Sequence, residues 1–236
     1  MMRIPYVAIL IVFSTPVFAQ DVSEDFGSSI AKGNMLISTT FSLNHKESEN
    51  EATLLQNLDD SYRIDWNFTL RSGYFIKDNF AIGGFFKYSN KLDQKSYTEN
   101  SEPIRDEQLE KSYSVAPFIR NYLPLGDGRF CLFNETNLEF TYGSFVRQVD
   151  GIDDINRTVG DSYELKLGIQ PGIAGFITDF VSFEVGTSLL GLSSKRTSSV
   201  YNGDEENKGY TFSNDVNFKI DLLSLFLGIT FYFPVK

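Results

Sequence analysis

Charged side chains of both signs recur at alternate positions within apolar segments, and they have the most capacity for chemistry in this chain. In residues 61–88, Arg63, Asp65 and Arg71 share one face, whereas the intervening positions are mainly aromatic or aliphatic. Successive side chains of an extended chain point to opposite sides, so this pattern predicts strands with two different faces. The charged positions predicted to share the polar face are Arg63, Asp65, Arg71, Arg120, Glu135, Glu139, Glu164, Lys166 and Glu184.

Residue types that support enzymatic or metal chemistry are scarce. His45 is the single histidine, so a histidine-based metal cluster and the HExxH pattern are absent, as are a phosphate-binding glycine loop and a GxSxG motif. Cys131 is the single cysteine and is expected to pack as a small apolar side chain. The acidic segments 150–154 and 204–206 lack the spacing of a calcium loop. We therefore predict no catalytic residue, no metal site and no cofactor.

The N-terminal sequence and the overall charge indicate the cellular destination of the chain and a class of partner that it disfavours. Residues 1–19 combine Arg3, an apolar run and a small-residue exit, which is typical of a secretory signal peptide cut between Ala19 and Gln20. A polar leader is expected over 20–32 and the folded domain over 33–236. The formal charge of −10 disfavours nucleic acid as a partner. The mature chain contains no apolar stretch long enough for a membrane-spanning helix, so a membrane role would depend on strands.

Short and long connections alternate along the chain. Tight turns containing Asp, Asn or Gly occur at 77–79, 125–128 and 178–179, while the longer, hydrophilic connections cover 46–60, 93–108, 150–158 and 197–209. This alternation places all long loops at one end of an up-and-down barrel, as in outer-membrane barrels. The expected strands are 33–45, 61–76, 80–92, 109–123, 129–149, 159–177, 180–196 and 210–233.

The composition of the two strand faces decides which one is inside. The polar face mixes glycines and bulky aromatics with both signs of charge, which suits the crowded interior of a small barrel better than a surface in water. The apolar face must then contact lipid. We predict an all-β protein, an eight-stranded antiparallel up-and-down transmembrane β-barrel with extracellular long loops. The apolar parity of the last strand shifts, which predicts a bulge near Leu222 and Leu223.

Two segments carry a resemblance to a known family. The run Ser114 to Pro124 is similar to the Pro-Phe-x-Arg-Tyr-Tyr run before a periplasmic turn, and Leu227 to Phe233 is similar to the aromatic C-terminal strand of small barrels. The chain resembles the eight-stranded OmpA-like or porin-like outer-membrane barrels of Gram-negative bacteria, of the kind found in the Bacteroidetes. The resemblance implies outer-membrane localisation, contact with outer-membrane lipid, and recognition of the C-terminal strand by the barrel-assembly machinery.

Several functions fit such a barrel. The leading hypothesis is a structural or interaction role through the four long extracellular loops, with a lumen filled by side chains and a loop partner that the sequence does not name. The alternatives are a small-solute channel, a conduit for hydrophobic ligands, a lipid-modifying enzyme that uses His45 at the top of the first strand, and a secreted soluble ligand-binding barrel.

Overall fold

A computed structural model describes residues 29–52, 57–99, 102–151, 155–188, 190–204, 208–218 and 225–235. The expected signal peptide and most of the expected leader lie outside these residues. The described chain is all-β, and no helix in it is long and apolar enough to cross a membrane. The strands are β1 (Asn34–Ala52), β2 (Asn57–Lys77), β3 (Phe80–Glu99), β4 (Glu102–Leu125), β5 (Phe130–Asp150), β6 (Ile155–Thr178), β7 (Val181–Gly186), β8 (Leu190–Tyr201), β9 (Gly209–Phe218) and β10 (Phe226–Pro234).

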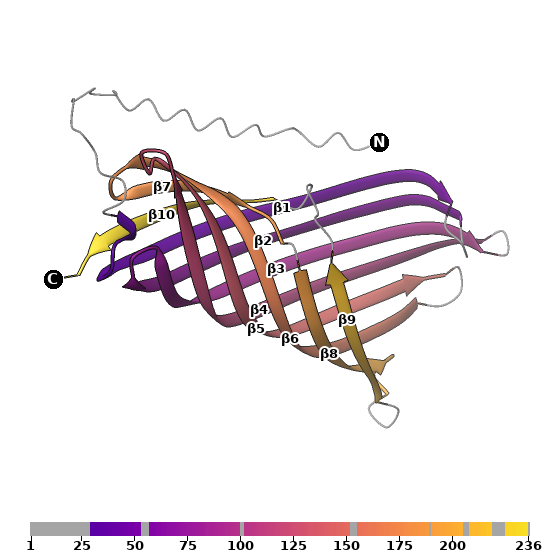
Figure 1. The fold of residues 1–236 in the computed structure, drawn as a ribbon. Coiled ribbons are helices and arrows are strands. Elements are labelled where there is room, and N and C mark those ends of the chain that lie inside the picture. Colours follow the sequence, from indigo (N-terminus) through magenta and orange to yellow (C-terminus); the bar gives the residue numbers. More distant parts are fainter. Residues whose placement is uncertain are drawn as a thin grey trace.

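Antiparallel hydrogen bonding closes the sheet into a barrel (Figure 1). Strands β1 to β6 pair in sequence, β6 pairs with β7, β7 with β10, and β10 returns to β1 over Asn34↔Pro234 to Phe41↔Leu227. The ring therefore passes through eight strands, and the fold class expected from the sequence is confirmed. We call the end with the short turns the turn end and the opposite end the hairpin end.

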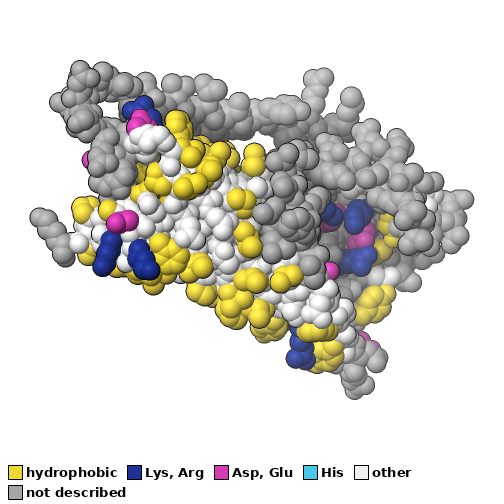
Figure 2. All heavy atoms as spheres, in the orientation of Figure 1, with side chains coloured by type: hydrophobic (Ala, Val, Ile, Leu, Met, Phe, Trp, Pro, Cys, Tyr) yellow, Lys and Arg dark blue, Asp and Glu magenta, His cyan; other side chains and the backbone are white. Residues whose placement is uncertain are grey.

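The apolar face of each strand points out of the barrel. Along β5, exposed residues such as Leu138 and Phe140 alternate with buried ones such as Glu135, Asn137 and Glu139. Hydrophobic side chains accordingly cover much of the outer surface in the space-filling view (Figure 2). A soluble barrel would bury this face, whereas a membrane barrel presents it to lipid. The outward assignment of the apolar face is therefore confirmed.

Together the outward apolar side chains form a belt around the barrel, which we call the apolar belt. Aromatic side chains lie at the boundary of this belt nearer the hairpin end. The ring of Tyr88 lies 5.3 Å from that of Trp66 and 5.2 Å from that of Tyr113. Tyr113 is paired in register with Tyr142, whose ring is 5.3 Å from that of Tyr163. Such rows sit at the membrane–water interface because the ring is apolar and the hydroxyl is polar. We call these five residues the aromatic girdle.

The turn end is closed tightly. Asn79 and Gly126 adopt positive φ angles of 62° and 59°, which lets the chain reverse within the expected turns. The last residues of the expected leader pack there: Ile30 is fully buried, and its carbonyl accepts a 2.8 Å hydrogen bond from the amide of Asn79. The segment ahead of β1 therefore contributes to the core of the barrel.

The expected long loops are largely strand. β1 continues to Ala52 and β2 starts at Asn57, and similarly β3 and β4 extend to Glu99 and from Glu102. The prediction of loops over 46–60 and 93–108 was therefore wrong in extent, and the same holds for 150–158 and 197–209. Strands that project into water can carry polar residues on both faces, so the loss of apolar alternation does not end the ladder.

The last two expected strands are each divided. Segment 180–196 forms β7 and β8, and segment 210–233 forms β9 and β10. The outward face changes parity at both divisions, from Phe183 to Leu192 and from Phe212 to Ile229. The bulge expected at 222–223 lies outside the described residues, although the change of parity that predicted it is present on either side.

These divisions leave one side of the barrel wall without backbone pairing. In the described residues, β9 pairs only with β8, and β1 beyond Phe41 pairs only with β2. In Figure 1, β8 and β9 run steeply in a different direction from β1, which extends from left to right along the top of the view. We call the interval between residues 42–52 and 209–218 the side opening. Within the described residues, the barrel is thus closed by hydrogen bonds at the turn end and unpaired along the side opening at the hairpin end.

The outward face of β5 allows a direct test of lipid contact. Leu138 and Val146 lie on opposite sides of Tyr142, at equal distance along the strand, and both belong to the outward parity. Leu138→Arg should lower the free energy of unfolding from lipid vesicles by about 2 to 4 kcal/mol, because the charge enters the hydrocarbon, and Val146→Arg by only about 0 to 1 kcal/mol. Denaturant titration of both variants measures this difference, and equal losses would contradict the placement of the membrane.

Candidate functional site: the lumen

The centre of the lumen is a fully buried ion cluster around Arg120 on β4. Its Nε and Nη2 donate to Oε2 of Glu135 at 2.9 and 2.7 Å, and Nη1 donates to both carboxylate oxygens of Glu184 at 3.0 and 2.9 Å. Nη1 also donates to the hydroxyl of Tyr122 at 3.1 Å. Glu184 lies on β7, so one guanidinium joins strands on different sides of the barrel. Burial of three charges is tolerable because each is paired and hydrogen-bonded.

Arg71 on β2 supplies the second cation. Its Nε lies 3.4 Å from Oε1 of Glu135, and its Nη1 donates to Thr40 of β1 at 2.9 Å. Thr230 of β10 donates to Glu184 at 2.7 Å. The lumen cluster, defined as Arg71, Arg120, Glu135 and Glu184, therefore connects β1, β2, β4, β5, β7 and β10. Two cations and two carboxylates make it formally neutral.

Aromatic rings fill the lumen around and below this cluster. The Arg120 guanidinium lies 4.6 Å from the ring centroid of Phe133, while Phe75 and Phe176 lie 6.2 and 5.1 Å from Tyr232. These rings and the ring of Tyr122 are buried. The ring of Phe133 packs against Gly172, where an added Cβ would lie 2.2 Å from Cζ. Glycine on β6 thus gives the aromatic ring the room it needs.

A second charged group lies nearer the hairpin end and is less tightly packed. Lys87 forms an ion pair with Glu139, and Glu139 is paired in register with Lys166. These residues and Glu164 line a polar cavity of about 130 Å³. A further cavity of about 150 Å³ lies against Arg71 and includes Gln170 and Phe226 in its lining. The lumen is therefore filled toward the turn end and hollow toward the hairpin end.

Ion pairs connect neighbouring strands on the hairpin side of the aromatic girdle. Arg63 donates from Nε and Nη2 to Oδ2 of Asp93 at 3.0 and 2.5 Å. Arg147 on β5 forms a two-pronged pair with Asp106 on β4, at 2.9 and 2.7 Å. These hydrogen bonds to Asp106 raise the pKa of Arg147 above its ordinary value. Exposed pairs of this kind contribute little to stability, but they set the register of polar hairpins.

The nine charged positions grouped by the sequence fall in different places. Arg71, Arg120, Glu135 and Glu184 form the lumen cluster, and Glu139, Glu164 and Lys166 lie above it. Arg63 pairs with Asp93 on the neighbouring strand, and Asp65 is half-buried without an ion pair among the described residues.

Some lumen residues escaped the sequence prediction. Lys87, Tyr122 and Phe75 have the inward parity of their strands, and this parity could have identified them. Phe226 has the inward parity of the shifted pattern over 225–233, so the same signal could have identified it.

The described lumen holds few groups suited to catalysis. The hydroxyl of Tyr232 lies 3.4 Å from that of Tyr122 and 3.1 Å from that of Ser182, so these hydroxyls partner one another. Cys131 is buried and its thiol faces the carbonyl of Gly128 at 3.6 Å. Within the described chain, no three His, Cys, Asp or Glu side chains are placed to hold a metal ion. The side chain of His45 lies outside the described residues.

Removal of the central cation tests how the lumen is held. Arg120→Ala leaves Glu135 and Glu184 buried with one cation between them, which should lower the free energy of unfolding by roughly 3 to 5 kcal/mol. Arg147→Ala removes the same charge from an exposed pair and should cost below about 1 kcal/mol. Denaturant titration in vesicles compares the two variants. A loss for Arg120→Ala no larger than that for Arg147→Ala would refute the structural importance of the cluster.

Comparisons with known proteins find matches only among solved structures, at low similarity. No family model and no curated protein matches the chain. The outer membrane protein OprG from Pseudomonas aeruginosa is 14% identical with a TM-score of 0.42, over 91% of this chain and 100% of that chain. The attachment invasion locus protein Ail of Yersinia pestis is 10% identical with a TM-score of 0.35, over 86% of this chain and 99% of that chain.

A match to a larger receptor is partial. The ferric yersiniabactin uptake receptor FyuA from Yersinia pestis is 12% identical with a TM-score of 0.35, over 72% of this chain, which spans 26% of that receptor. The narrower expectation of a Bacteroidetes-type barrel finds no support among the matches. The closed ring, the outward apolar belt and the aromatic girdle are observed in the chain itself. The described chain is an antiparallel β-barrel with an eight-stranded ring and an apolar outer face of the kind that contacts lipid.

Proposed function

We propose that the protein is a non-conducting outer-membrane barrel that acts through its extended hairpins outside the cell. The observation that carries this proposal is the lumen cluster, in which Arg120, Glu135 and Glu184 are fully buried. Aromatic rings surround these charges on the side of the turn end. A path for solutes along the barrel axis would require separation of buried ion pairs, which is energetically costly.

The orientation follows from the lengths of the connections. Turns such as 78–79 are too short to leave the interface, whereas the hairpins around residues 52 and 99 extend well beyond the aromatic girdle. Outer-membrane barrels carry short turns in the periplasm and longer connections outside. Residues 1–19 act as the export signal in this proposal, and β10 is the strand recognised by the barrel-assembly machinery. Protease added to intact cells should cut the hairpins and spare the turns.

The hairpin end offers a surface suited to a binding partner rather than to catalysis. Its strands carry charges of both signs, held by pairs such as Arg63–Asp93, Arg147–Asp106 and Lys195–Glu110. Mixed charge on rigid strands favours contacts with a polar macromolecule or with the glycan layer of the cell surface. The proposal assigns no catalytic residue to this surface.

Electrical recording tests the closed lumen. Purified protein inserted into a planar lipid bilayer should give no stable current steps, because the lumen cluster blocks the axis. A porin added afterwards to the same bilayer provides the positive control. A large, reproducible conductance from this protein would refute the proposal and favour a small-solute channel.

The side opening favours a second candidate, a conduit for hydrophobic ligands. The cavities at the hairpin end lie above the filled part of the lumen, and Thr40, Ser42 and Phe226 line the one beside the divided wall. A molecule that entered from outside would be blocked toward the periplasm and could leave only sideways, between β1 and β9. Lipid offers no hydrogen bonds to an open sheet edge, so such an opening is tolerable only where it faces water or a ligand.

Amide hydrogen exchange in lipid nanodiscs distinguishes these candidates. If the side opening persists in the bilayer, the amides of β9, which has one neighbour, should exchange faster than those of β5, which has two. Protection of residues 213–218 equal to that of residues 130–140 would show that the wall is closed, and the conduit would be excluded.

A further inference from the structure

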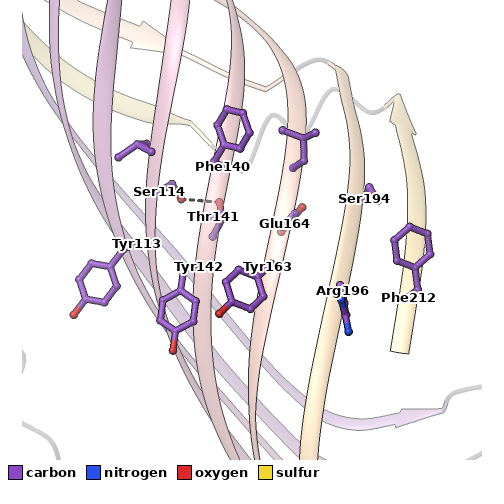
Figure 3. A pocket seen from close by; sticks show the side chains of 12 residues that line it. Tyr113, Ser114, Phe140, Thr141, Tyr142, Tyr163, Glu164, Ser194, Arg196 and Phe212 are labelled. Atoms are coloured by element: carbon purple, nitrogen blue, oxygen red, sulfur yellow. Dashed lines mark hydrogen bonds between the residues drawn. The ribbon is translucent and has the colours of Figure 1, made fainter. Parts of the chain in front are cut away.

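A shallow groove of about 460 Å³ lies on the outer wall of the barrel, at the level of the aromatic girdle. It crosses β4, β5, β6, β8 and β9, and its floor is formed by outward residues such as Val115, Phe140 and Leu165. Tyr113, Tyr142 and Tyr163 form one border (Figure 3). In this view their rings lie in a row and their hydroxyls point to the same side. A groove at this position is in contact with the lipid layer.

One cation, Arg196, lies in the lining of this mainly apolar groove. Arg196 on β8 is paired in register with Tyr163 and Phe212, so its side chain belongs to the lipid-facing side. Figure 3 shows its guanidinium directed to the same side as the tyrosine hydroxyls. The guanidinium carbon lies 5.4 Å from the ring centroid of Tyr210, and Nζ of Lys208 lies 6.0 Å from the same centroid. Two cations therefore flank one aromatic ring.

These cations lack acidic partners in the described part of the chain. No ion pair involves Arg196 or Lys208 there, in contrast to Arg63, Arg120 and Arg147. Glu164 is in the lining of the groove and also lines the lumen cavity, and Asp161 accepts a 2.9 Å hydrogen bond from the hydroxyl of Tyr142. An arginine at the lipid interface extends its head toward the polar layer and binds phosphate through paired N–H donors. The position of Arg196 and Lys208 is thus suited to binding an anionic group of a membrane lipid.

We propose that this groove binds the phosphorylated glycolipid of the outer leaflet. Arg196 and Lys208 contact a phosphate group, the acyl chains lie on the floor over Val115, Phe140 and Leu165, and the tyrosine hydroxyls contact the sugar. The width of the groove, which crosses five strands, suits a lipid with several acyl chains better than one with two. The carboxylate of Asp161 disfavours an anion at the tyrosine border, so the phosphate lies on the β8–β9 side.

The outer-leaflet source depends on the orientation proposed above, whereas binding itself does not. Native mass spectrometry of the full chain, reconstituted with equal amounts of diphosphoryl lipid A and phosphatidylglycerol, measures binding and the preference between the two lipids. We expect wild type to retain lipid A in preference, and Arg196→Gln to lower the retained fraction by about tenfold, since a charge-assisted contact is lost. Lys208→Gln should lower it in the same direction.

Arg157→Gln is the matched control. It removes the same charge from an exposed outward position of β6, on the hairpin side of the girdle and outside the groove. It should leave lipid retention unchanged. Heat-dependent mobility on gels establishes that each variant is folded, and Arg196→Lys keeps the test available if Arg196→Gln does not fold.

Three results would overturn the proposal. Unchanged retention of lipid A in Arg196→Gln would show that Arg196 does not contribute to the site. An equal loss of retention in Arg157→Gln would show that the effect depends only on net charge. Equal retention of lipid A and phosphatidylglycerol would show a site without preference for the glycolipid. Because the membranes in this experiment are symmetric, an inverted orientation in cells would leave all three measurements unaffected.

Discussion

The buried guanidinium of Arg120 is the interaction on which the barrel interior depends. It faces a carboxylate of β5 on one side and a carboxylate of β7 on the other, at distances of 2.7 and 2.9 Å. Glu135 has Arg71 as a second cation, whereas Arg120 is the cation that pairs with Glu184, and the ring of Phe133 packs against the guanidinium. The same contacts therefore hold the strands together, exclude solvent from the axis and make the turn-end half of the barrel a solid core.

The other half of the barrel follows a different physical rule. Beyond the aromatic girdle the strands lie in water, so their polar groups need neither burial nor lipid contact, and ladders continue through segments rich in charge. Pairs such as Arg147–Asp106 align neighbouring strands at small energetic gain. The surface that results is formed by paired strands with polar side chains, whereas connecting segments are commonly irregular loops.

The divided strands connect the two halves. β7 and β10 stay in the ring, whereas β8 and β9 pair with each other and reach the barrel only through β6. Arg196, which lines the lipid-facing groove, is an outward residue of β8, and Lys208 immediately precedes β9. A lipid bound there would contact both the ring and the hairpin that departs from it. Lipid binding in the groove would therefore be coupled to whether the side opening of the barrel is open or closed.

The sequence by itself determined the fold class and the direction of the two faces, because a period of two is a local property of each strand. It also determined the short turns, since residues such as Asn79 and Gly126 support positive φ angles without help from distant contacts. The inward charges could be named individually for the same reason. Their parity is set by the strand on which they lie.

Only the tertiary structure decided which charges meet. Glu184 approaches Arg120 across the lumen, and Glu139 turns instead to Lys87, because partner choice depends on strand tilt and on the volume of rings such as Phe133. The division of the last two expected strands was not predicted, because a change of parity such as the one near Leu222 and Leu223 fits a bulge within one strand as well as a break between two strands. The alignment of Arg196 with Tyr163 and Tyr210 arises from pairing between separate strands, and no local pattern encodes it.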